Sequence, residues 1–155
     1  MPGFMDNYVF GGAKVDFAGQ DTAKELFLGA TFANASQIKT TAAAAKGLDY
    51  GTNEGYYKQY AAVRIQRMDQ FDAEIGSVEI TLYDSEDNTT FTQAAKLFLR
   101  ASDLDEANRT PVLMVVPSTV KRYVAMSVKF NVASGKTLAK LTKGSLLAQI
   151  TPTRW

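Results

Sequence analysis

Residues 112–132 contain the two clearest strand patterns of the sequence, and they constrain most strongly what the chain can fold into. The first pattern is an unbroken apolar run at 112–116 that Pro117 closes. Such a short run, rich in β-branched residues, predicts a strand that is buried on both faces. The second pattern, at 123–132, alternates apolar and polar residues, which predicts an antiparallel strand with one face in water. A β-sandwich or a β-barrel needs strands of both kinds.

Shorter patterns of the same kind recur along the rest of the chain, separated by Gly, Pro, Asp and Asn turns. Helical patterns are few and are confined to residues 36–46 and 102–110. The 155 residues therefore predict a mainly β fold, a single-domain β-sandwich with one or two short helices and with the jelly roll as the favoured topology. Besides the two central strands, we expect strands near residues 8–10, 13–17, 24–28, 61–66, 78–83, 91–100 and 145–150.

Two segments differ from this pattern. Residues 1–24 mix glycine with aromatic residues, and they form either an ordinary first hairpin or an extended N-terminal arm that reaches a neighbouring subunit. Residues 30–50 contain four alanines before Lys46-Gly47, which resembles the last turn of a helix with Gly47 in the left-handed position after it. We interpret 30–50 as an insertion that is either a partner contact or a solvated surface loop.

The composition argues against several classes of protein. The chain has no cysteine and no histidine, so disulfides, thiolate or imidazole metal sites and histidine-based nucleophiles are excluded. A formal net charge of +1 argues against a dedicated nucleic-acid binder. Neither a leader pattern nor an apolar stretch of about 18 residues is visible, which favours synthesis in a cytoplasm and no membrane partner. We expect no metal and no cofactor.

An enzyme that uses carboxylates on this scaffold is a weaker alternative. Glu79, on the polar side of a predicted strand, is the kind of residue that it would need. A glycosidase requires two carboxylates that face one substrate, and no second carboxylate lies at a matching strand position. We therefore expect a protein that is not an enzyme.

Several stretches resemble those of a known family in their residue patterns and in their order along the chain. A Tyr8-Val9-Phe10 strand is followed by L-F-L-G at 26–29 and by V-E-I-T-L-Y-D-S-E-D-N at 78–88. V-P-S-T-V-K-R-Y-V-A-M-S-V-K-F-N-V then occupies 116–132, before a closing A-x-I strand. Together these stretches resemble the small capsid cement, or decoration, proteins of short-tailed phages of the Bordetella phage group. The resemblance spans most of the chain, and residues 30–50 depart from it.

The resemblance implies a structural virion protein on the capsid exterior, made and assembled in the bacterial cytoplasm. It would bind the outer surface of a bacteriophage capsid and stabilise contacts between major capsid protein subunits, without nucleic acid. It would also form a homo-oligomer, with a trimer expected ahead of a dimer. The alternative is a phage tail, baseplate or head-fibre component whose β-sandwich binds a receptor or a glycan. The expected capsid or subunit contacts are Phe4, Tyr8, Phe10, Tyr56, Tyr57, Tyr60, Arg154 and Trp155.

Overall fold

The computed structural model of the chain describes residues 9–10, 14–29, 38–49, 61–104, 112–117 and 119–152. These residues are mostly in strands, with a four-residue α-helix, α2 (Ala42–Ala45), and a 3-10 helix at Ala101–Leu104. The mainly β class predicted from the sequence is confirmed. The strands are β1 (Val15–Asp16), β2 (Glu25–Leu28), β3 (Leu48–Asp49), β4 (Ala61–Asp69), β5 (Ile75–Ser85), β6 (Thr92–Arg100), β7 (Val112–Val115), β8 (Tyr123–Val132) and β9 (Ser145–Pro152).

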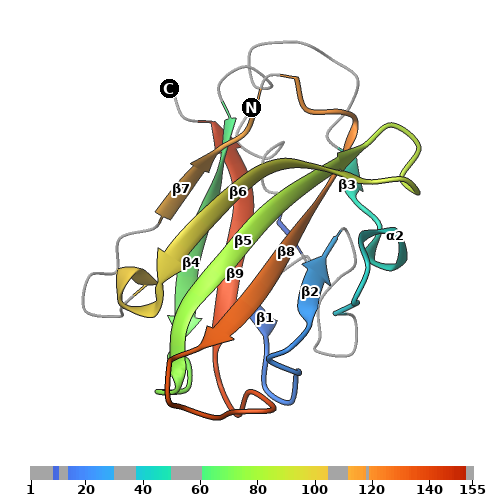
Figure 1. Cartoon of the computed structure of the whole chain (residues 1–155). Helices are drawn as coiled ribbons and strands as arrows, with labels where there is room; N and C mark the ends of the chain where they lie inside the picture. The colour runs from blue at the N-terminus through green and yellow to red at the C-terminus, as the bar shows by residue number, and fades with distance from the viewer. Residues whose placement is uncertain are drawn as a thin grey trace.

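The strands form two antiparallel sheets that pack against each other as a β-sandwich, as the sequence predicts (Figure 1). The first sheet has the order β1-β9-β4-β7, and the second has the order β2-β8-β5-β6, with β3 also pairing with β8. Val15 on β1 lies opposite Leu146 on β9, and Leu26 on β2 lies opposite Val128 on β8. Each sheet therefore joins strands from the beginning and the end of the described chain.

The core lies between the two sheets and is filled by alternate side chains of the strands. Near one end of the sandwich the ring of Phe130 lies between those of Phe17 and Phe71, with edge-on contacts and centroid distances of 5.2 Å to each. Full burial of one large apolar side chain contributes about 1.5–3 kcal/mol. The core between the two sheets, which contains many such side chains, is therefore the main source of stability. Other fully buried members are Phe10, Leu26, Ile65, Ile80, Leu82, Met126, Leu141, Leu146 and Ile150.

Helix α2 covers part of the outer face of the second sheet, away from the main core. The Thr41 hydroxyl accepts a hydrogen bond from the N–H of Ala44 at 3.2 Å, which caps the start of the helix. Ala42 and Ala45 then pack against Phe27 of β2 and Ala125 of β8, forming a second small apolar cluster. The helix expected within 36–46 is confirmed at these four alanines, of which Ala42 and Ala45 lie against the sheet.

The end of α2 differs from the prediction. Lys46, and not Gly47, has the positive φ of 62°, with ψ at 155°. Gly47 is needed for space, because a Cβ atom there would lie 2.9 Å from the backbone nitrogen of Val124. Its N–H donates to the side-chain oxygen of Asn88 at 2.6 Å. The glycine therefore lets the chain pass closely over β8.

The burial of each of the two central strands differs in part from the prediction. β7 lies at an edge of the first sheet, where the side chains of Leu113 and Val115 are 55% and 69% exposed and Met114 faces the core. β8 lies between β2 and β5, and Ala125 and Ser127, on its expected wet side, are buried. An apolar run shows that a strand is hydrophobic, but not that a second layer covers it.

The remaining strand predictions are mostly confirmed. Residues 92–100 form a strand, as the sequence predicts for 91–100. The helical turns expected at 102–110 begin earlier, as the 3-10 helix, and the carboxylate of Asp103 accepts the N–H of Arg100 at 2.9 Å. Val9 makes an isolated bridge to Gln149. Among the described residues, no helix is long and apolar enough to span a bilayer.

Candidate binding surface

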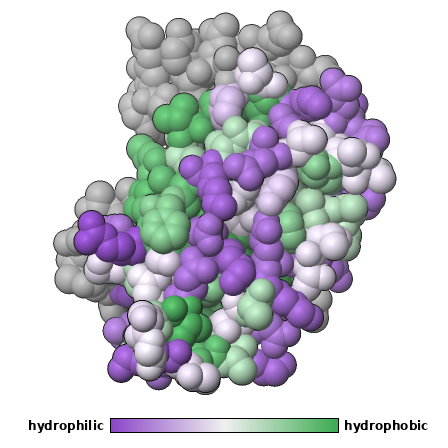
Figure 2. Space-filling view, viewed as in Figure 1, coloured by the Kyte–Doolittle hydropathy of each residue, from purple (hydrophilic) through white to green (hydrophobic). Residues whose placement is uncertain are grey.

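The outer face of the second sheet divides into a covered half and an open half. Helix α2 and its neighbours cover the part over β2 and β8, as described above. Figure 2, in the view of Figure 1, shows the open half: hydrophilic residues cross the face over β5 and β8, and hydrophobic surface lies along its β6 side. We refer to Ser77, Glu79, Lys96, Phe98 and Asn131, which belong to this half, as the open face.

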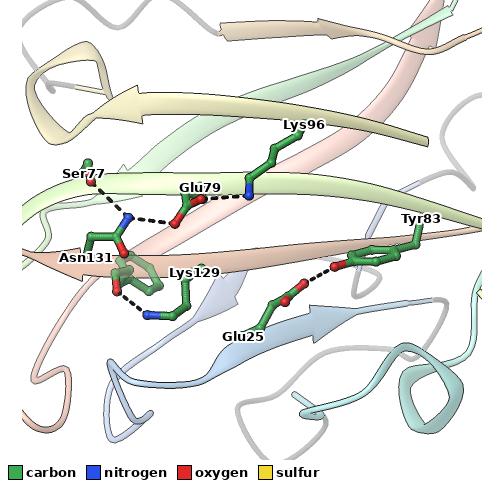
Figure 3. A network of polar contacts seen from close by, with 8 residues as sticks. Glu25, Ser77, Glu79, Tyr83, Lys96, Lys129 and Asn131 are labelled. Carbon is green, nitrogen blue, oxygen red and sulfur yellow. Dashed lines mark hydrogen bonds and ion pairs between the residues drawn. The ribbon is translucent and has the colours of Figure 1, made fainter. Parts of the chain in front are cut away.

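Glu79 of β5 is the centre of a hydrogen-bonded network on the open face (Figure 3). Its carboxylate accepts a charged hydrogen bond from Lys96 Nζ of β6 at 2.9 Å and another from Asn131 Nδ2 of β8 at 3.0 Å. Asn131 Nδ2 also donates to Ser77 Oγ at 3.1 Å. Polar groups from three neighbouring strands are thus fixed relative to one another before any ligand arrives, which limits the ordering cost of binding.

The environment of Glu79 favours its charged form. The hydrogen bond from Lys96, followed by that from Asn131, holds the pKa of the Glu79 carboxyl below its usual value. A general acid of a glycosidase needs a raised pKa, so this shift is in the opposite direction. In the part of the chain that the structure describes, no group of three or more Asp or Glu is placed to hold a metal ion. Glu79 therefore presents an ionised carboxylate on the open face.

Lys129 of β8 lies next to the open face and ties it to the chain before β2. It lies opposite Glu79 in register, and its Nζ donates to the carbonyl oxygens of Thr22 at 3.1 Å and of Phe130 at 3.2 Å. The Lys129 ammonium is therefore directed toward backbone carbonyls, and the turn that precedes β2 is anchored to β8.

A second polar contact marks the border between the open and covered halves. The hydroxyl of Tyr83 donates a hydrogen bond to the carboxylate of Glu25, as Figure 3 shows. Burial, together with this negative neighbour, raises the pKa of Tyr83 to about 12. The Tyr83 ring also packs on Phe27, with a centroid distance of 5.3 Å. Tyr83 thus links β5 to Glu25 of β2 and packs against Phe27 of the alanine-rich cover.

Phe98 of β6 is the apolar element of the open face. Its side chain is 61% exposed, and it lies directly opposite Glu79 in the strand register. Lys96 and Arg100 flank it on the same side of β6 because side chains two residues apart point the same way. A single exposed hydrophobic residue is ordinary. An aromatic ring inside a fixed polar surround, however, has the anatomy of a binding hot spot, in which an apolar anchor is ringed by polar groups.

The structure describes one of the eight residues that the sequence singles out for contacts. Phe10 is fully buried, and its N–H donates to the carbonyl of Ala148 at 2.9 Å. Its side chain packs inside the subunit, so the surface role expected for it does not fit its position. The other seven lie outside the described residues, namely Phe4, Tyr8, Tyr56, Tyr57, Tyr60, Arg154 and Trp155.

Sequence reasoning missed Phe98, although a signal was present. In the run K-L-F-L-R at 96–100, the two leucines face the core and Phe98 falls on the side of the charged residues. A large aromatic residue on the polar side of a strand is the signal.

Comparison with known proteins assigns no family, because no family model and no curated protein matches the chain.

Proposed function

We propose that this chain is a structural protein of a bacteriophage virion, a capsid cement or decoration protein that binds the outer surface of the shell. In this role it stabilises contacts between neighbouring major capsid protein subunits. The observation that carries the proposal is the open face, where Phe98 is 61% exposed beside the Glu79 network. This surface suits a protein partner, because it combines an apolar anchor with a pre-ordered polar rim.

The strand order supports the jelly-roll topology that the strand pattern of the sequence favours. When β3 is set aside and the remaining eight strands are numbered in chain order, one sheet runs 1-8-3-6 and the other 2-7-4-5. This order is typical of an eight-stranded jelly roll, a fold that recurs in viral capsid proteins and in lectins. One fold serves many functions, so the topology by itself does not assign a role. It agrees with the family resemblance, and the open face is the feature that supports binding.

The electrostatics of the chain also suit a shell protein. The formal net charge is +1, and the open face carries both signs, with Lys96 and Glu79 paired on it. The binding free energy of such a contact is modest for each copy. On a symmetric lattice, however, hundreds of copies act together, and a subunit that touches two neighbours gains through its effective concentration.

The test is the binding of purified protein to heads of the encoding phage that were assembled without it. Wild-type protein should bind and restore a ratio to the major capsid protein near one, measured by quantitative mass spectrometry. Phe98→Ser should weaken binding at least about tenfold, the loss expected of an anchor residue. Phe98→Tyr should retain most of it.

A matched control is Met68→Ser, which removes a side chain that is 43% exposed and lies on β4 of the other sheet. It should bind like wild type. Equal binding by the Phe98→Ser variant and the wild-type protein would disprove the role of the open face. Failure of the wild-type protein to bind heads, together with its absence from virions, would disprove the function itself.

The second candidate is the tail, baseplate or head-fibre component that binds a receptor or a glycan. Phe98 beside the Glu79 carboxylate and the Asn131 amide favours it too, because sugars combine an apolar ring face with hydroxyl groups. Copy number separates the two candidates. A ratio of a few per cent to the major capsid protein, with glycan binding that Phe98→Ser abolishes, would establish the second candidate.

A further inference from the structure

We propose that two copies of this chain associate through β7, which pairs in antiparallel fashion with the β7 of a second copy across a two-fold axis. The pairing joins two four-stranded sheets into one continuous sheet. It does not rest on the proposed function, because Phe98 and the open face belong to the other sheet. The purified chain alone tests it.

The two sheets end in the edge strands β1, β7, β2 and β6. An edge strand with free N–H and C=O groups pairs readily with another chain unless it is protected. β1 is two residues long and contains Asp16. β2 contains Glu25, and Phe27 exchanges backbone hydrogen bonds with Lys39, so another segment runs along this edge. β6 has Lys96 and Arg100 on its outer face and a register shift next to Leu82 of β5. Each of these edges has a recognised protective device.

β7 has none of these devices in the described chain. Residues 112–117 contain no charged side chain, and β7 pairs with β4 without a register shift. Val63 of β4 lies opposite Met114, which faces the core. On the outer face, Leu113 and Val115 are 55% and 69% exposed. Among the described residues, no strand pairs with β7 on its other side. Pro117 lies two residues beyond the end of β7, so the strand itself is an apolar, regular and uncharged edge, which makes it a pairing site.

The absence of charge on β7 selects a second copy as the occupant. Across a two-fold axis the strand faces an inverted copy of itself, so a strand whose charges all have one sign would place like charges side by side. The same pairing at β6 would bring Lys96 and Arg100 of both copies together. β7 carries no charge and is electrostatically compatible with itself.

The faces of the sheet fix the register. Outward side chains must stay outward in the joined sheet, which allows only registers that preserve the alternation. In the register centred on Met114, Leu113 of each copy lies directly opposite Val115 of the other copy. Four exposed apolar side chains then form one cluster on the outer face, and both Met114 side chains remain on the core side.

Disulfide cross-linking tests this register, because the chain has no cysteine of its own. Directly opposite residues have Cβ atoms about 4.5–5.5 Å apart, against about 7–8 Å for diagonal neighbours. A disulfide needs the short distance. We expect a mass-tagged Leu113→Cys chain mixed with a Val115→Cys chain to form the mixed dimer under mild oxidation, several-fold above either homodimer. Phe98→Cys, which is equally exposed, is the control and should cross-link with neither.

Equal cross-linking in every combination, or none in any, would overturn the pairing.

The second measurement is sedimentation of the unmodified chain, which should be a dimer in the micromolar range. Val115→Lys should weaken the dimer at least tenfold and leave the circular dichroism spectrum unchanged, because this side chain lies on the surface. Phe98→Lys should remain a dimer. A wild-type monomer or trimer would also overturn the proposal. Phe98→Ser should affect binding to heads but not dimerisation, so the two proposals fail separately.

Discussion

The hydroxyl and the backbone N–H of Thr142 both donate hydrogen bonds to the carboxylate of Asp72, 70 residues earlier in the chain. The N–H bond is 3.0 Å long, and Asp72 is only 7% exposed. Burial raises the pKa of Asp72, but the bonds from Thr142 and the N–H of Lys143 outweigh burial, so the pKa is held below its usual value. This contact fastens the loop between β4 and β5 to the loop between β8 and β9.

Asp72→Ala should therefore lower the free energy of unfolding by about 2–3 kcal/mol, because the buried carboxylate that accepts both hydrogen bonds from Thr142 is lost. Urea denaturation at pH 7 measures the change. Asp103→Ala is the control, since its carboxylate accepts one exposed backbone bond, and it should cost about 0.5–1.5 kcal/mol. Equal losses in the two variants would contradict the role assigned to Asp72.

The stability of the protein should fall in acid, and Asp87 should contribute to the fall. Hydrogen bonds from the N–H groups of Thr90 and Thr89 and from the Ser85 hydroxyl lower the pKa of Asp87 to about 2. In the unfolded chain an Asp titrates near about 3.9, so the folded state binds this proton more weakly. The stabilisation is complete above about pH 4 and is lost as the pH falls through about 2.

Urea midpoints measured between about pH 2 and 6 test this prediction. Asp87→Asn should flatten the dependence below about pH 4. The carboxyl groups of Asp72 and Glu79, whose pKa values are also lowered, should keep part of the slope. A variant with the full wild-type dependence would show that the Asp87 turn does not carry the effect.

Two glycines with positive φ form a natural pair for separating backbone strain from crowding. Gly144 has φ 119°, and a Cβ atom there would overlap the ring of Phe71. Gly135 has φ 79°, with nothing within 4 Å of the added atom. Gly135→Ala should cost about 1–2 kcal/mol from strain, and Gly144→Ala about 1–3 kcal/mol more from overpacking. Thermal or urea unfolding measures both, and equal losses would contradict the crowding at Phe71.

Lys46→Gly should stabilise the protein, which is unusual for a substitution to glycine. Lys46 adopts φ 62° and ψ 155°, a region used almost only by glycine, where another residue stores about 1–3 kcal/mol of strain. Extra freedom of the unfolded chain offsets about 0.5–1 kcal/mol, so the expected net gain is about 1 kcal/mol. Lys39→Gly, a residue without positive φ, should destabilise. A loss of stability in the Lys46→Gly variant would contradict the strain.

The sequence predicts the strands well but not their place in the sheets. Residues 112–116 and 123–132 are both recognised as β, because hydrophobicity and alternation are local properties. Whether a strand lies at an edge or at the centre depends on its neighbours. β8 is central because β2 and β5 flank it. Its outer face is buried at Ala125 because α2 covers it, and no residue in 123–132 predicts that cover. For the same reason, the apolar run at 112–116 does not predict that the side chains of Leu113 and Val115 are exposed.

The candidate binding surface is predictable only in part. Glu79 is visible in the sequence as a charged residue on the polar side of a strand, and Phe98 is recognisable as an aromatic on such a side. The bonds from Lys96 and Asn131 depend on the register of three strands, which is set across the sheet and not along the chain. The order of the strands in each sheet belongs to the same level of organisation.

The pairing of β1 with β9 and of β2 with β8 also determines when the protein can fold during its synthesis. The ribosome makes Val15 and Leu26 more than 100 residues before their partners Leu146 and Val128. During that interval neither strand has its native partner strand, and both expose side chains destined for the core. Such long-range pairing folds slowly, which lengthens the time in which the nascent chain is exposed to aggregation.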